Sequence, residues 1–288
     1  MTETASKFLV ETSWLAERMG APDLIILDGS MHLPTAQRDA FAEYKQEHIP
    51  GAMFFDINDI SNEKSSLPHM LPSAAKFASR MRKMGIGDGM RIVVYDSEGL
   101  YSAARVWWMF RTMGHEDVAV LNGGLKKWKA EGRPVTDEVT QLRTPRHFTG
   151  RLIAELVRDK DDVQGLIGSK TTQIVDARSA GRFAGTVPEP RAGLRSGHIP
   201  SSKNVPFGSL LNPDGTLKPA SELASIFKAA GVDAAKPVVA TCGSGVTAGV
   251  IALALAQLGQ TNAAVYDGSW SEWGLEDAGT PVATGPTG

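Results

Sequence analysis

The chain contains a single cysteine, and its neighbours are suited to nucleophilic chemistry. Cys242 directly follows the apolar run 237–241, and the small residues Gly243, Ser244 and Gly245 come next. Small residues let the backbone curl tightly and point several N–H groups at one place, and a helix that begins just after them favours a bound anion. Amides that converge in this way favour the ionised thiolate form of cysteine. The sequence therefore predicts that Cys242 is an ionised, reachable nucleophile.

An apolar filler, a P-loop and a cysteine phosphatase loop are the alternatives to a nucleophilic cysteine in this stretch. Free cysteine is among the most buried residue types and often fills apolar space. A phosphate-binding P-loop requires a lysine after its second glycine, and the stretch GSGVTAG has none there. A cysteine phosphatase requires an arginine that closes the turn, and that residue is also missing. The position after a strand, the two glycines and the lack of other thiols favour a nucleophile over an apolar filler.

The sequence resembles itself with a period of about half its length, which indicates a duplicated domain. In both halves, short Val/Ile-rich runs alternate with helical patterns, as is typical of mainly parallel sheets with helices on both faces. We therefore expect an α/β fold with two tandem domains, residues 1–135 and 150–288, joined by a polar linker at 136–149. The corresponding blocks keep their order: LIILDGS with TQIVDAR, EHIPGAMFFDI with GHIPSSKNVPF, RIVVYDSEGLYSA with PVVATCGSGVTA, and AVLNGGLKKW with AVYDGSWSEW. The expected strands are Leu24–Leu27, Ile92–Tyr95, Val118–Leu121, Ile174–Asp176, Val238–Thr241 and Ala263–Tyr266.

The repeat also provides an internal control for the cysteine loop. When the two halves are aligned, Asp96 stands at the position of Cys242 and Glu98 at the position of Ser244. A carboxylate cannot carry a transferable sulfur atom, and two acids in one loop repel an anionic substrate. We therefore expect the N-terminal domain to be catalytically inactive and the C-terminal domain to carry the reaction.

Composition excludes several other classes of function. The formal net charge of −2 argues against nucleic acid as a partner. A lone cysteine cannot form an internal disulfide, and no Cys/His cluster has metal-ligand spacing, so we expect a reducing compartment, no metal and no cofactor. The N-terminal stretch MTETASKFLVETSWLAERMG lacks a secretory or transit pattern, and no apolar run reaches the ~20 residues of a membrane span. These features predict a cytoplasmic protein that does not bind a membrane.

Together the motifs resemble the tandem-domain rhodanese superfamily, and CGSGVTAG is similar to the active loop of its 3-mercaptopyruvate sulfurtransferase branch. In the thiosulfate branch, Arg and Lys typically follow the cysteine, whereas this chain has Gly243 and Ser244. A neutral loop gives up the charge that favours a compact dianion. The resemblance therefore implies mercaptopyruvate as the preferred donor, with a thiosulfate:cyanide sulfurtransferase as the first alternative. A non-catalytic module that binds an anion or a partner through this loop is the second. The similarity extends over HIPGAMFFDI, VVYD, LNGGLKKW, GRFAG, PEPRAGLRSGHIP, ATCGSGVTAG and YDGSWSEW.

The resemblance also implies which side chains bind the donor. Arg182 in GRFAG and Arg191 in PEPRAG match the two arginines that hold the donor's carboxylate and keto oxygens. Guanidinium groups bind carboxylates bidentately and keep their charge, although an arginine here could equally pair with Glu189 or solvent. The loop residues expected to contact the substrate are Gly243, Gly245, Val246 and Thr247. For Thr247, capping of the following helix is the alternative.

Family members of the mercaptopyruvate branch also use a serine together with a histidine and an aspartate. The resemblance implies Ser244 and His48 as catalytic partners of Cys242, with Asp39 as the aspartate. His198 stands in the second half where His48 stands in the first, so a role in the fold is the alternative for this histidine. In the implied mechanism, Cys242 takes sulfur from mercaptopyruvate, pyruvate leaves, and the persulfide passes sulfur to an acceptor thiol, a dithiol protein such as thioredoxin, or cyanide.

Overall fold

A computed structural model describes residues 7–287, and this part of the chain divides into two compact units. Unit 1 extends to Glu63 and includes Leu71–Ile153 and Asn212–Leu217. Unit 2 includes Lys64–Met70, Ala154–Leu211 and the described chain from Lys218 onwards. Residues 1–6, where the N-terminal stretch considered for targeting begins, lie outside the described residues.

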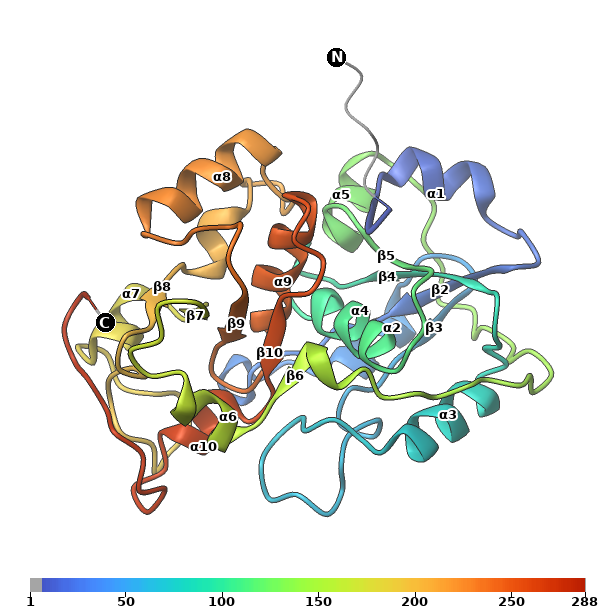
Figure 1. Ribbon diagram of the computed structural model, residues 1–288. Helices are drawn as coiled ribbons and strands as arrows, with labels where there is room; N and C mark the ends of the chain where they lie inside the picture. The colour runs from blue at the N-terminus through green and yellow to red at the C-terminus, as the bar shows by residue number, and fades with distance from the viewer. Residues whose placement is uncertain (1–6, 288) are drawn as a thin grey trace. The chain divides into compact units, whose positions relative to one another are not determined.

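Unit 1 is built on a parallel five-stranded sheet (Figure 1), with the strand order β1-β5-β4-β2-β3. The central strands β2 and β4 are buried along almost their whole length, as apolar strands of a sheet covered on both faces must be. The strands are β1 (Leu9–Val10), β2 (Leu24–Asp28), β3 (Ala52–Phe54), β4 (Arg91–Tyr95) and β5 (Val118–Leu121). The helices are α1 (Thr12–Arg18), α2 (Ala40–Gln46), α3 (Ala74–Lys83), α4 (Ala103–Thr112) and α5 (Gly124–Ala130), with a 3-10 turn η1 (Pro34–Ala36).

Unit 2 repeats this sheet, with the order β6-β10-β9-β7-β8 and parallel pairing of the same kind. Its strands are β6 (Val157–Arg158), β7 (Gln173–Asp176), β8 (Lys203–Asn204), β9 (Val238–Thr241) and β10 (Ala264–Tyr266). Its helices are α6 (Lys160–Gly165), α7 (Ala180–Ala184), α8 (Ala220–Ala229), α9 (Ala248–Gln257) and α10 (Ser269–Trp273), with the 3-10 turns η2 (Ala154–Leu156) and η3 (Phe207–Leu210). The predicted α/β fold with two tandem domains, each a mainly parallel sheet flanked by helices, is confirmed.

The duplication extends to individual side chains in the two cores. Trp128 on α5 and Trp273 on α10 are both fully buried. Trp128 Nε1 donates to Pro134 O at 2.7 Å, and Trp273 Nε1 donates to Pro281 O at 2.8 Å. A buried indole needs such a partner for its N–H group. The equivalent proline carbonyls show that each unit ends its repeat in the same way.

The division into units differs from contiguous domains in two respects. Residues 212–217 join unit 1, where Leu217 N donates to Asn122 Oδ1 at 2.9 Å, and residues 64–70 join unit 2. The predicted linker 136–149 also packs on unit 1, since Arg143 donates to the carbonyls of Pro22 and Leu24 at 2.7 and 2.9 Å. Local composition predicted a polar linker but could not show that its arginine reaches the surface of unit 1. Among residues 7–287, no helix is long and apolar enough to cross a membrane.

Candidate active site

Cys242 lies where the fold favours ligand binding, at the carboxyl end of β9 and just before α9. The first residues of α10 hold the backbone at this point. Ser269 Oγ accepts from Cys242 N at 3.1 Å, and Trp270 N donates to Cys242 O at 3.0 Å. Ser271 donates to Gly243 O from both its backbone N at 2.8 Å and its hydroxyl at 2.7 Å. The cysteine loop, residues 242–247, therefore starts from a fixed backbone.

The serine that holds the Cys242 amide adopts a rare conformation. Ser269 has φ 49°, in the left-handed region that side chains other than glycine seldom adopt. The corresponding residue in unit 1 is Gly124, with φ 54°. Unit 2 thus places a side chain where the repeat prefers glycine, and its hydroxyl contacts the reactive residue. Strain of this kind is concentrated at functional sites.

The thiol lies beneath the surface, in polar surroundings. Cys242 is 2% exposed and Ser244 is 5% exposed. The thiol is therefore buried, whereas the sequence predicted a reachable one. A Cβ built at Gly243 would lie 2.9 Å from Arg182 Nη2, so the guanidinium covers the loop beside the cysteine. Only glycine leaves room for this close approach. Gly245, with φ 72°, supplies the left-handed turn before α9.

Arg182 belongs to a buried ion-pair network in unit 2. Glu189 accepts from Arg182 and also from Arg178, and Arg178 is in turn paired with Asp176. Burial by itself lowers the pKa of Arg178, but the carboxylates of Asp176 and Glu189 outweigh it, so the pKa is raised. The sequence alternative in which Arg182 pairs with Glu189 is therefore present, and it places the guanidinium at the loop.

Arg191 contacts a histidine that sequence patterns did not identify. Arg191 Nη2 lies 3.4 Å from Nε2 of His69, which belongs to the 64–70 segment of unit 2. His69 has φ 62°, so its backbone also adopts the left-handed conformation. One signal was available: His69 lies between two prolines, Pro68 and Pro72, in a stretch without helical or strand periodicity.

His48 has the environment of a structural residue. It is 1% exposed, its Nδ1 donates to Tyr44 O at 2.7 Å, and its ring stacks on Tyr44 at 4.1 Å. His198 repeats the arrangement in unit 2, with Nδ1 2.8 Å from Phe183 O and a ring stack at 3.8 Å. We infer from this equivalence that His48 anchors the His-Ile-Pro turn. The Nε2 atoms of His48 and His198 are both buried without a hydrogen-bond partner among the described residues, and a chemical role for His48 stays a prediction.

The expected pairing of His48 with Asp39 is absent. Asp39 is the N-cap of α2, where its carboxylate accepts from Phe41 N and Ala42 N at 3.0 Å. It is exposed, and no hydrogen bond joins it to His48 in the described chain. The spacing that suggested Asp39 reflects a helix start. Thr247 is the N-cap residue of α9 but makes no side-chain cap hydrogen bond, so the structure does not support capping, the alternative to substrate contact.

Unit 1 shows what the same turn does with a carboxylate. The Asp96 loop, residues 96–102, connects β4 to α4, and the Asp96 side chain accepts four backbone N–H groups. Burial raises the pKa of Asp96, while these four donors oppose the shift. The donors are Glu98 N and Gly99 N, both at 3.0 Å, Tyr101 N at 2.7 Å and Ala103 N at 2.8 Å. The turn is therefore an anion cradle that unit 1 fills with its own side chain.

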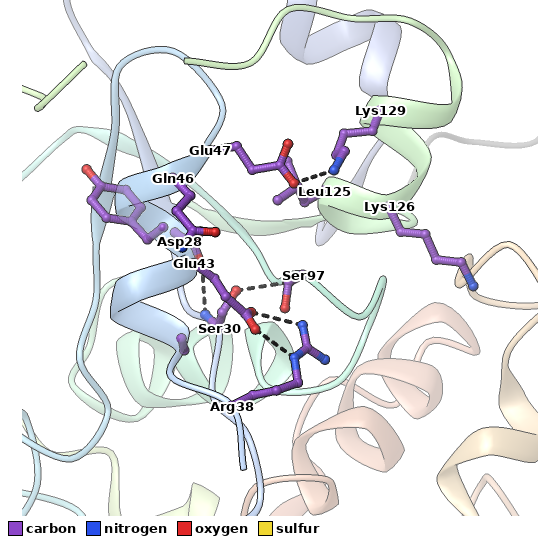
Figure 2. Close-up of a pocket in the computed structure, with 12 residues that line it drawn as sticks. Asp28, Ser30, Arg38, Glu43, Gln46, Glu47, Ser97, Leu125, Lys126 and Lys129 are labelled. Atoms are coloured by element: carbon purple, nitrogen blue, oxygen red, sulfur yellow. Dashed lines mark hydrogen bonds and ion pairs between the residues drawn. The ribbon is translucent and has the colours of Figure 1, made fainter. Parts of the chain in front are cut away.

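A pocket of about 430 Å³ lies in unit 1 (Figure 2), and it contains none of the predicted site residues. Asp28 and Ser97 line it, and two ion pairs extend across it. Arg38 pairs with Glu43 at 2.7 Å, and Lys129 pairs with Glu47. These groups neutralise each other. The pocket is thus charged but has no thiol, and the candidate chemistry remains in unit 2.

Known protein families and relatives match both halves of the chain. A family model described as a rhodanese-like domain matches residues 11–131 and 159–276. The 3-mercaptopyruvate sulfurtransferase of Escherichia coli (strain K12) is 44% identical over 279 residues, which cover 96% of this chain and 98% of that protein. The thiosulfate sulfurtransferase of Bos taurus is 46% identical over 272 residues, which cover 92% and 91%.

A solved structure agrees with these relatives. The crystal structure of SseA from Escherichia coli, described as a 3-mercaptopyruvate sulfotransferase, matches with a TM-score of 0.83 and 42% identity over 92% of this chain and 99% of that chain. Two equivalent α/β units, of which one carries a thiol loop, define the class as tandem rhodanese-like proteins. The chain belongs to the rhodanese-like family, in the branch of its 3-mercaptopyruvate sulfurtransferases, and the resemblance drawn from the motifs is confirmed.

Proposed function

We propose that the protein is a sulfurtransferase that moves the sulfur of 3-mercaptopyruvate onto Cys242 and releases pyruvate. One observation carries this assignment: the chain's only thiol lies at the carboxyl end of β9, with the Arg182 guanidinium 2.9 Å from a Cβ built at Gly243. A fixed cation beside a cysteine in an anion cradle suits a donor that has both a carboxylate and a transferable sulfur.

The neutral residues of the cysteine loop support a keto-acid donor over thiosulfate. Gly243 and Ser244 add no charge next to the thiol, so the loop offers amide dipoles but no cation of its own to a compact dianion. Arg182 and Arg191 then bind the carboxylate and keto oxygen of mercaptopyruvate. The thiol is only 2% exposed, so the loop beside it must move to admit the donor sulfur, while Arg182 stays paired with Glu189. Residues 243 and 245–247 line the path of the donor sulfur.

The chemical step balances without a cofactor. The Cys242 thiolate attacks the donor sulfur, an S–S bond forms, and the C–S bond breaks with its electron pair on the pyruvate enolate. The proton of the donor thiol moves to the enolate carbon, which leaves pyruvate and an ionised cysteine persulfide. Arg182, Arg191 and the Ser244 hydroxyl stabilise the enolate. We assign the proton transfer to His69, because it contacts Arg191 in unit 2.

The acceptor completes a ping-pong cycle. A thiol attacks the outer sulfur of the persulfide, and the acceptors that we propose are small thiols, a dithiol protein such as thioredoxin, and cyanide. A lone cysteine that must cycle through its thiolate suits a reducing compartment, so we propose the cytoplasm. Thiosulfate is the second candidate donor, because the thiosulfate sulfurtransferase of Bos taurus is 46% identical to this chain.

Intact-mass measurement tests the proposal. After incubation of pure protein with 3-mercaptopyruvate, we expect a gain of ~32 Da that cyanide removes and that Cys242→Ser abolishes. Absence of the adduct with both donors would favour a non-catalytic module. If kcat/KM for thiosulfate exceeds that for mercaptopyruvate, the donor assignment is wrong and the alternative activity replaces it.

A further inference from the structure

Glu189 is a buried acid beside a site that we assign to an anionic donor. Its side chain is only 1% exposed. Its Oε1 accepts from Arg178 Nη1 at 2.9 Å and from Arg182 Nε at 3.1 Å, and its Oε2 accepts from Arg182 Nη2 at 2.5 Å. A buried carboxylate is stable only when it is paired and hydrogen-bonded. Glu189 satisfies this requirement by joining two arginines.

Arg178 anchors Glu189 and is itself immobile. The Arg178 side chain has no exposed surface, and its guanidinium stacks on Trp270 at 4.2 Å. Its Nε donates to both carboxylate oxygens of Asp176 at 3.0 and 3.1 Å, and its Nη2 donates to Asp176 at 2.6 Å and to Gly197 O at 2.8 Å. An arginine bound on this many sides cannot follow a substrate, so it provides a fixed support for Glu189.

Arg182 is the member of the network that reaches the reaction site. Its side chain is 20% exposed, and its Nη2 lies 2.9 Å from a Cβ built at Gly243, next to the nucleophile. Glu189 uses the Nε and one Nη2 hydrogen of a guanidinium that has five donor hydrogens. Three donor hydrogens remain for a carboxylate or keto oxygen. The bidentate pair therefore decides which edge of Arg182 the donor meets.

The charges of the network show that Glu189 contributes orientation and not attraction. Asp176 and Glu189 balance Arg178 and Arg182, so the four side chains are neutral as a set. Without Glu189 the site would be more cationic and would attract an anion more strongly. A guanidinium that is already oriented loses less rotamer freedom when the donor binds. The benefit of Glu189 must therefore appear in the geometry of donor binding.

We propose that Glu189 is a positioning residue for donor binding: it holds the Arg182 guanidinium against the cysteine loop, with one edge turned to the donor. The inference rests on the proposed function. Glu189 touches neither the donor nor the reacting sulfur and acts through Arg182. Arg178 and Asp176 form the rigid base from which it does so.

Kinetics of Glu189→Gln provide the first test. The amide keeps the size of the side chain but loses the bidentate acceptor for Arg182. We expect KM for 3-mercaptopyruvate to rise about 10- to 100-fold, with kcat changed less than about threefold. Glu189→Asp keeps the charge and should give a smaller rise. The matched control is Glu222→Gln, which breaks the exposed Lys218–Glu222 pair of unit 2 and should leave both parameters unchanged.

A double-mutant cycle separates positioning from a merely structural role. In an Arg182→Ala background, Glu189→Gln should change kcat/KM by less than about twofold, because the residue through which it acts is gone. An equal loss in both backgrounds, or a parental KM in Glu189→Gln, would overturn the proposal. If Glu189→Gln does not fold, Glu189→Asp in the two backgrounds gives the same test. Parent protein that forms no persulfide would instead refute the proposed function itself.

Discussion

The Asp96 loop of unit 1 and the cysteine loop of unit 2 follow equivalent strands, β4 and β9, and precede equivalent helices, α4 and α9. In unit 1, four backbone N–H groups converge on the Asp96 carboxylate. In unit 2, the corresponding position carries the thiol of Cys242. The turn binds an anionic side chain in unit 1, and we propose that the equivalent turn of unit 2 favours the Cys242 thiolate. The Asp96 loop is structural because its anion is a side chain of the protein itself. The cysteine loop can carry out chemistry because a thiolate can form a bond to a further sulfur atom.

The residue just before the ring that stacks on the histidine carries opposite charges in the two units. Glu43 precedes Tyr44, which stacks on His48, and Arg182 precedes Phe183, which stacks on His198. Unit 1 therefore has an acid where unit 2 has Arg182, to which we assign donor binding. Arg38 neutralises this acid within unit 1, since it pairs with both Glu43 and Glu98. The comparison indicates that the fold tolerates either charge at this edge of the sheet, and that unit 2 is the one with a cation for an anionic donor.

Exchange of the central side chain gives the largest expected effect. Cys242→Asp places the residue of unit 1 in the cradle of unit 2, and we expect sulfur transfer to fall at least about a thousandfold. The Tm should stay at or above that of Cys242→Ser, because the new carboxylate can accept the loop amides. Pyruvate release and thermal unfolding measure the two effects. A Tm far below that of Cys242→Ser would show that the two cradles are not equivalent.

Reversal of the charge at Arg182 is expected to have the second-largest effect. Arg182→Glu gives unit 2 the charge that Glu43 gives unit 1, and it sets a second carboxylate against the buried Glu189. We expect kcat/KM for mercaptopyruvate to fall about 10²- to 10³-fold, since losing one partner of a desolvated charge pair costs about 2 to 5 kcal/mol. Arg182→Lys should lose less. Steady-state kinetics with intact-mass detection of the persulfide would check it, and a parental kcat/KM would contradict the donor-binding role of Arg182.

Asp96→Asn tests whether the Asp96 carboxylate stabilises the fold without taking part in sulfur transfer. The amide group turns a donor toward two of the four N–H groups that Asp96 accepts. We expect the free energy of unfolding to fall by about 2 to 4 kcal/mol. Activity per folded molecule should remain that of the parent, because Asp96 takes no part in transfer. Urea unfolding and active-site titration separate the two, and a specific loss of turnover would assign unit 1 a catalytic contribution.

The smallest expected effect concerns the acids at the ends of two equivalent strands. Asp176 has Arg178 as its partner, whereas Asp28 has Ser30 at that position, and burial raises the pKa of Asp28 to about 6. A raised pKa in the folded state means that stability is present at low pH and is lost as pH rises from about 4 to about 6. Asp28→Asn should remove this loss, so its stability relative to the parent should rise by up to about 3 kcal/mol between pH 4 and pH 7. Urea unfolding across that range measures it, and a pH-independent difference would contradict it.

Local patterns in the sequence were enough for much of the fold. The repeat aligned Asp96 with Cys242 and located the six central strands, because apolar runs and glycine turns depend on nearby residues. The same patterns could not identify the histidine near the donor site. His48 and Asp39 stand at a suggestive spacing, yet His48 Nδ1 and the Asp39 carboxylate are both bonded to the backbone of α2, and His48 Nε2 is buried without a hydrogen-bond partner among the described residues. His69 has no periodic signal, and its position between two prolines indicates a loop but not the contact with Arg191.

The duplication, the two parallel sheets and the single thiol in a glycine turn are all visible in the linear chain, since they follow from composition and short-range periodicity. Two other features required the folded molecule: residues 64–70 join unit 2, and Glu189 orients Arg182 beside Gly243. Such contacts join residues from different elements, and they depend on burial and on competition among several acids for each arginine. No local pattern records which pairing has the lower free energy.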